Sequence, residues 1–112
     1  MEINDTIIDG LVVITLQGSF LGGKDSVNFA ETISRCIEEG NTNILLDLGR
    51  LDYMNSIGLG SVVNGYLKLK KSNGQLVIAN AKTRVLELLR LTKTDTVIPL
   101  CESIEAAKEM LA

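Results

Sequence analysis

The sequence contains no histidine and no tryptophan, and aromatic residues make up only 4% of its 112 positions. The absence of histidine excludes Ser-His-Asp and Cys-His nucleophile systems, phosphohistidine relays and metal sites built from imidazole. An enzyme with this composition would have to use carboxylates, lysine, tyrosine or backbone amides. The scarcity of aromatic side chains also argues against a platform that stacks the bases of single-stranded nucleic acid.

Cysteine is almost absent too, with Cys36 and Cys101 as its only two occurrences. Both lie among apolar residues and they form no C-x-x-C pair, and two thiolates alone do not complete a zinc site. We therefore expect two small buried hydrophobic residues without a disulfide, which is typical of the reducing cytoplasm. We expect neither a metal nor any other cofactor.

No strong excess of charge is present, since eleven basic and fourteen acidic residues give a net charge of −3. Nucleic acids and anionic membranes are bound through basic patches, so we expect neither as a partner. The acidic segment 1–5 does not resemble a signal peptide. The longest apolar run, residues 11–16, is far too short to cross a membrane. These features predict a cytoplasmic protein.

What is present is the composition of one globular domain spanning residues 1–112, with 46% hydrophobic residues and no linker or repeat. Strand-like and helix-like segments alternate along it. Strands are expected at residues 3–8, 11–17, 44–48, 75–79 and 96–100, and helices at 26–39, 56–72, 81–91 and 104–111. Asp9-Gly10 is typical of a hairpin turn, and Pro99 favours an edge position for the last strand.

This order, β-β-α-β-α-β-α-β-α, predicts an α/β fold: a mixed, mainly parallel sheet packed with four helices. Side chains at the helix starts suggest N-caps, and two segments suggest C-terminal stops. The expected N-caps are Asp25 or Ser26, Ser56, Asn80 and Ser103, and the expected stops are Gly40 and Asn73-Gly74.

One glycine-rich segment, Gly18-Ser19-Phe20-Leu21-Gly22-Gly23-Lys24, matches the G-x-x-x-x-G-K pattern of a phosphate-binding loop between a strand and a helix. Asp25 follows, where such loops carry the Ser or Thr that binds Mg²⁺, and its carboxylate would repel phosphates. A small nucleotide-binding enzyme is therefore the disfavoured alternative. The simpler interpretation is a glycine-rich connection between a strand and a capped helix.

The segment Met54-Asn55-Ser56-Ile57-Gly58-Leu59-Gly60 opens the second helix, which contains three glycines. Each glycine costs about 1 kcal/mol relative to alanine in an exposed helix interior. Such a helix needs a close approach of its backbone, either to the sheet, as we expect for Gly60 and Gly65, or to a docked partner. Ser56 is then either a plain N-cap or a hydroxyl placed where a phosphate would meet free N–H groups and the positive end of the helix dipole.

Residues 44–79 resemble the anti-sigma factor antagonist family, the STAS domain. That family has an apolar strand ending near LDL, a short loop, Asp-Ser-small-Gly-Leu-Gly at a helix start, a Gly-Gly or Asn-Gly turn and another apolar strand. The matching stretches here are Leu46-Asp47-Leu48, residues 51–60 and residues 73–79. Asn55 replaces the usual aspartate and Ile57 the usual small residue. Phe20-Leu21 stand where the family carries an acidic residue after the glycine of its second strand.

The resemblance implies a regulatory binding protein and not an enzyme. The unphosphorylated form would bind an anti-sigma factor with serine-kinase activity of the GHKL type and so release a sigma factor. The kinase would then phosphorylate Ser56 and break the complex. The alternative within the same fold is a STAS component of another sensory complex or of a transporter-associated regulator.

We expect the partner to dock on two loops, because the loops that follow parallel strands cluster at one edge of the sheet. The expected contact residues are Phe20, Leu21, Gly22, Gly23 and Lys24 from one loop and Tyr53, Met54, Asn55, Ser56, Ile57, Gly58, Leu59 and Gly60 from the other.

Overall fold

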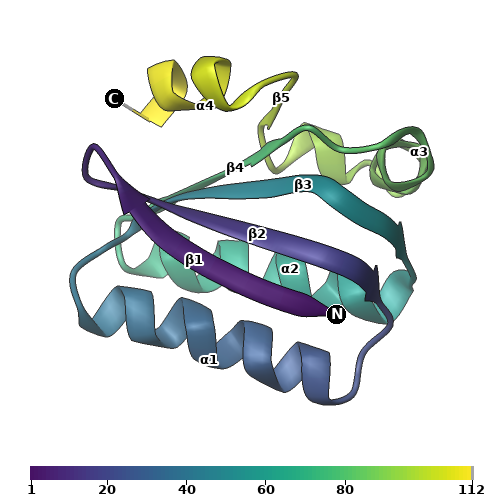
Figure 1. Cartoon of the computed structure of the whole chain (residues 1–112), viewed down its shortest axis with the longest axis horizontal. Helices are drawn as coiled ribbons and strands as arrows, with labels where there is room; N and C mark the ends of the chain where they lie inside the picture. The colour runs from purple at the N-terminus through teal and green to yellow at the C-terminus, as the bar shows by residue number, and fades with distance from the viewer. Residues whose placement is uncertain (112) are drawn as a thin grey trace.

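Five strands form one mixed sheet in the order β1-β2-β3-β4-β5 in a computed structural model that describes residues 1–111 (Figure 1). β1 is antiparallel to β2, and the other neighbouring pairs are parallel. The strands are β1 (Glu2–Ile8), β2 (Leu11–Phe20), β3 (Asn43–Met54), β4 (Gln75–Ala79) and β5 (Leu100–Cys101). The helices are α1 (Lys24–Glu38), α2 (Ser56–Lys71), α3 (Thr83–Leu91) and α4 (Ile104–Leu111), with a short 3₁₀ helix, η1 (Thr94–Thr96). The predicted α/β fold is confirmed.

Both faces of the sheet are buried along the apolar runs 11–14, 44–46 and 76–79, which explains why successive residues there are apolar. In β3, Ile44 and Leu46 belong to the larger hydrophobic cluster, whereas Leu45 belongs to the smaller one. α1 and α2 lie side by side on the face of the larger cluster, and α4 lies over the opposite face (Figure 1). Ala107 and Leu111 of α4 complete the smaller cluster.

The hairpin between β1 and β2 turns at Asp9 and Gly10, as predicted. Their φ angles are 53° and 81°, so both residues adopt the left-handed conformation that a tight hairpin turn requires. The pairing begins immediately beside the turn, with Ile8 opposite Leu11.

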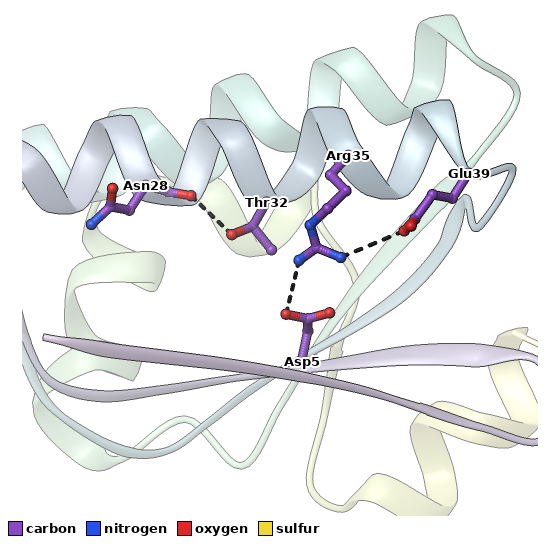
Figure 2. Close-up of polar contacts among 5 residues, drawn as sticks. All are labelled: Asp5, Asn28, Thr32, Arg35 and Glu39. Atoms are coloured by element: carbon purple, nitrogen blue, oxygen red, sulfur yellow. Dashed lines mark hydrogen bonds and ion pairs between the residues drawn. The ribbon is translucent and has the colours of Figure 1, made fainter.

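A group of exposed polar side chains joins the edge strand β1 to α1 (Figure 2). Arg35 Nη2 lies 2.9 Å from Asp5 Oδ1, and Arg35 Nη1 lies 3.5 Å from Glu39 Oε1. The hydrogen bond to Asp5 and the charge of that carboxylate raise the pKa of the Arg35 guanidinium above its ordinary value. The arginine therefore stays charged and links the first strand to the helix beneath it.

The strands β2 and β3 are longer than predicted. Residues 49–53 lie outside the strand predicted at 44–48, but they continue β3, and β2 extends to Phe20, beyond the predicted end at residue 17. The additional residues pair with each other across the two strands: Gly18 with Leu51 after one irregularity in register, and Phe20 with Met54 after a second. This pairing joins segments about thirty residues apart, so local sequence patterns did not reveal it.

The fifth strand is shorter than predicted. Of residues 96–100, only Leu100 is in β5; Thr96 ends η1 instead. Pro99 lacks an N–H group, but its carbonyl accepts a hydrogen bond of 2.9 Å from the amide of Ile78. β5 does occupy the expected edge of the sheet, beyond β4.

The C-terminal stops of α1 and α2 follow the prediction. Gly40 has a φ of 78°, its amide donates to the carbonyl of Ile37, and the next amide, that of Asn41, donates to Cys36. This is the Schellman arrangement, in which a left-handed residue ends the helix. Asn73, with a φ of 59°, ends α2 in the same way.

The predicted N-caps are only partly right. Ser103 caps α4, since its Oγ accepts from the amide of Ala106 at 3.1 Å. The prediction of Asp25 or Ser26 for α1 was wrong, because Gly23 is the N-cap and no side chain caps that helix. Asn80 was also wrong: Lys82 precedes α3, whereas Asn80 has a φ of 61° and donates from Nδ2 to Asp47 Oδ1.

The two cysteines are both free but differ in exposure. Cys36 is 1% exposed, as expected, whereas Cys101 is half-buried, so the prediction of a buried residue was wrong there. Cys101 Sγ lies 2.9 Å from Met110 Sδ. Burial raises the pKa of both thiols above the ordinary value.

Candidate functional site

The N-terminus of α2 is capped by Asn55, not by Ser56. Asn55 has extended backbone angles, and its Oδ1 accepts hydrogen bonds from the amides of Ile57 at 3.1 Å and Gly58 at 2.9 Å. The helix starts at residue 56, as predicted, but the cap was misplaced by one residue, because asparagine and serine are similarly favourable N-caps. Ser56 is consequently the first residue within the helix.

This shift leaves the hydroxyl of Ser56 uncommitted. The side chain is exposed, and its Oγ has no hydrogen-bond partner within residues 1–111. Two of the N–H groups expected to be free at this helix end are occupied by Asn55, whereas the amide of Ser56 itself has no backbone partner in that range. Ser56 is therefore available for modification without first breaking a cap.

The two predicted loops lie together, as the parallel sheet requires. Phe20, at the end of β2, pairs with Met54, at the end of β3. The amide of Asn55 donates to the carbonyl of Phe20 at 3.2 Å, and Asn55 Nδ2 donates to the carbonyl of Leu21 at 3.1 Å. The segment between β2 and α1 is thus hydrogen-bonded to the start of α2.

Two glycines of α2 permit close approaches, but neither is the approach predicted from the sequence. A Cβ on Gly65 would lie 3.0 Å from the Phe29 ring and 3.3 Å from Ile33, so Gly65 admits α1 and not the sheet. The space at Gly60 is open, so the expectation for that residue was wrong. Gly58 is the residue that meets the sheet, because its Cβ would overlap the carbonyl oxygen of Phe20.

The predicted contact residues divide into a buried and an exposed group. The buried residues, which position the two loops, are Phe20, Met54, Gly58 and Leu59. The exposed residues are Leu21, Gly23, Lys24, Tyr53, Ser56 and Ile57, and Gly22, Asn55 and Gly60 are intermediate. Leu21, Tyr53 and Ile57 are 51%, 40% and 62% exposed, so the two segments together display three large hydrophobic side chains.

Residues 2–107 match the STAS domain family. The chain belongs to that family. It is also 30% identical over 107 residues to BtrV of Bordetella bronchiseptica, which is named as an anti-sigma factor antagonist; the match covers 96% of this chain and 91% of BtrV.

Solved structures agree with this STAS fold. A protein of Thermotoga maritima described as an anti-sigma factor antagonist superposes with a TM-score of 0.89 at 20% identity, covering 97% of this chain and 93% of that one. The Bacillus cell fate determinant SpoIIAA in its phosphorylated form superposes with a TM-score of 0.75 at 21% identity, covering 97% of this chain and 99% of that one.

α3 flanks the site of this STAS domain, which the sequence did not predict. The guanidinium carbon of Arg84 lies 5.0 Å from the centre of the Tyr53 ring, and Lys82 Nζ lies 2.8 Å from Asp52 Oδ1. These contacts join the start of α3 to the end of β3. No local sequence pattern indicates these contacts, because they depend on where the connection from β4 to β5 places α3.

The glycine-rich segment of the STAS domain does not have the layout of a phosphate-binding loop. Gly18 lies within β2, and only residues 21–23 separate β2 from α1. Lys24 is already the first residue of the helix, with its side chain exposed. The segment is therefore a short connection, as the simpler interpretation held.

Within residues 1–111, no group of three or more Cys, Asp or Glu side chains is arranged to hold a metal ion. Over the same residues, no helix combines the length and the apolar character needed to cross a membrane.

Proposed function

We propose that this STAS domain is an anti-sigma factor antagonist controlled by phosphorylation of Ser56. In its unphosphorylated form it binds an anti-sigma factor that is also a serine kinase of the GHKL type, and a sigma factor is released. The anti-sigma factor is the partner, and the STAS domain is the substrate of the kinase and not a catalyst. This exchange of partners takes place in the cytoplasm, where the released sigma factor acts in transcription.

The observation that carries the proposal is the exposed, uncommitted hydroxyl of Ser56 at the first position of α2. The relationship to BtrV, which is named as an antagonist, supports the partner class. The structure of SpoIIAA in its phosphorylated form supports a phosphorylation switch on this fold.

In the reaction, Ser56 Oγ attacks the γ-phosphorus of ATP held by the kinase. The new Oγ–P bond replaces the bond to ADP, which leaves, and the hydroxyl proton passes to a base of the kinase. The product carries about −1.5 to −2 charges where the hydroxyl was neutral. The positive end of the helix dipole makes that charge tolerable to the fold.

The contact surface that we propose combines the serine with the exposed side chains of the same two segments, Leu21, Tyr53 and Ile57. Their apolar area provides the affinity, and the small hydroxyl at the centre lets the partner approach closely. A phosphate at the centre would keep a hydrated dianion between the two surfaces. The apolar side chains of this surface could then no longer reach the partner.

The test is incubation with a serine-kinase anti-sigma factor from the same source and ATP, followed by mass spectrometry to locate the phosphate. We expect one phosphate, on Ser56, and none in Ser56→Ala. Ser61→Ala is the matched control, because Ser61 lies on the same helix but is hydrogen-bonded to Ser26 Oγ at 2.7 Å. Phosphate on another residue would contradict the proposal.

A further inference from the structure

The carboxamide of Asn55 forms hydrogen bonds at both of its ends. Oδ1 accepts from the amides of Ile57 and Gly58, while Nδ2 donates to the carbonyl of Leu21 at 3.1 Å. The surroundings fix this orientation, since two N–H groups need an acceptor and a carbonyl needs a donor. Within residues 1–111, this is the only side-chain hydrogen bond between residues 21–23 and the start of α2 with its cap.

An aspartate could make only half of these contacts. Its carboxylate would accept from Ile57 and Gly58 as well as the amide does, and its charge would suit the helix N-terminus. It has no hydrogen for the carbonyl of Leu21, so two oxygens would face each other there. The asparagine of this chain therefore serves the loop as well as the helix.

The segment that Asn55 tethers is joined to α1 at its far end, where the carbonyl of Gly23 accepts from the amides of Ser26 and Val27 at 3.1 and 3.3 Å. Gly22 and Gly23 have φ angles of 109° and 61°, a backbone conformation that glycine can leave freely. The side chain of Leu21 is 51% exposed. The remaining contact with α2 is apolar, where the Ile57 side chain lies over Gly22.

A phosphate on Ser56 would compete with Asn55 for the start of α2. The amides of Ile57 and Gly58 are the donors that follow Ser56, and both are now bound to a neutral amide oxygen. Hydrogen bonds to a charged oxygen are about twice as strong as those to a neutral one. The phosphate is therefore the better acceptor for these two amides.

We propose, on the basis of the phosphorylation proposed above, that phosphate on Ser56 takes the amides of Ile57 and Gly58 from Asn55. The displaced carboxamide then releases the carbonyl of Leu21, and residues 21–24 detach from α2. Asn55 is thus a positioning residue that transmits the modification to the neighbouring loop. The partner loses the shape of that loop in addition to meeting a charge at Ser56.

The test uses the full chain with phosphoserine incorporated at Ser56 during translation, so no kinase is needed. ¹⁵N NMR measures the Asn55 side-chain amide resonances and the backbone order parameters of Gly22 and Gly23. We expect the Asn55 resonances to shift and the order parameters to fall from about 0.85 to below about 0.6. Unphosphorylated Asn55→Asp should loosen the same two glycines.

Phosphoserine incorporated at Ser72, the exposed C-cap of α2, is the matched control and should leave Gly22 and Gly23 rigid. Rigid glycines and unshifted Asn55 resonances with phosphoserine at Ser56 would overturn the inference. Loosening in Asn55→Asp without loosening by phosphate would overturn it too, leaving Asn55 as a tether that does not respond to modification. A kinase that fails to modify Ser56 would refute the proposed function but would not alter these results.

Discussion

Gly58 lies so close to the backbone of Phe20 that a Cβ at Gly58 would overlap the carbonyl oxygen of Phe20. A backbone carbonyl cannot rotate away as a side chain can, so the start of α2 fits the end of β2 only with glycine at this position. The same contact brings Asn55 within hydrogen-bonding distance of Phe20 and Leu21. The glycine therefore sets the geometry of the whole candidate site.

The first prediction compares Gly58→Ala with Gly60→Ala. Gly58→Ala should lower the free energy of unfolding by about 1–3 kcal/mol, the usual range for overpacking. Gly60→Ala should raise it by up to about 1 kcal/mol, because the space at Gly60 is open and alanine favours the helix. Urea unfolding midpoints measure both. Equal effects of the two substitutions would show that the contact with Phe20 is not the reason for the glycine.

The second prediction concerns the two thiols. Cys101 is half-buried and Cys36 is 1% exposed, so Cys101 should react first with a thiol reagent such as DTNB, and Cys36 only on unfolding. Burial raises the pKa of both thiols in the folded chain. Above the ordinary thiol pKa of about 8.5, the unfolded chain loses protons first, so stability should fall as the pH rises further. Cys36→Ala is the control that should reduce this pH dependence. Prompt labelling of Cys36 in the native protein would contradict the burial argument.

The third prediction addresses the nucleotide-binding alternative. The protein should not turn over Mg-ATP or Mg-GTP, and Lys24→Ala should leave the fold nearly unchanged, because Lys24 is an exposed first residue of α1. A coupled assay for released phosphate and circular dichroism measure these properties. Hydrolysis by the wild type that is lost in Lys24→Ala would restore the enzyme hypothesis.

The buried strands and the hairpin were predictable because their signals are local. Apolar residues fill both faces of β3 and β4, and Asp9-Gly10 tolerates positive φ angles at both turn positions. The continuation of β3 through residues 49–54 was not predictable. It depends on pairing with β2, and no local pattern in those residues reports a partner strand.

The start of the helix at the candidate site was predictable, but its capping residue was misplaced by one position. Asn55 and Ser56 are adjacent and are similar N-caps, so intrinsic preference does not distinguish them. The structure distinguishes them by a contact outside the helix: Asn55 caps through Oδ1 and at the same time donates from Nδ2 to the carbonyl of Leu21. That long-range contact is what frees the serine.

The fourth prediction compares the loss of the hydroxyl at Ser56 with the introduction of a negative charge at the same position. Ser56→Ala should fold normally, bind the anti-sigma kinase and escape phosphorylation, because the Ser56 hydroxyl has no partner to lose within residues 1–111. Ser56→Asp and Ser56→Glu should also fold normally but bind more weakly, since like charge across an interface costs several kcal/mol. Circular dichroism and calorimetric titration check the two properties. An Ala variant that fails to bind would indicate that the hydroxyl itself is a contact.

The most direct test is the affinity of the anti-sigma kinase for the unmodified chain and for the same chain carrying phosphoserine only at Ser56, measured by calorimetric titration under identical conditions. A loss of about 3 kcal/mol in binding free energy corresponds to a roughly 100-fold larger dissociation constant. We expect a loss of at least this size upon phosphorylation, with both forms equally folded. Equal affinities of the two forms would contradict a phosphorylation switch at Ser56.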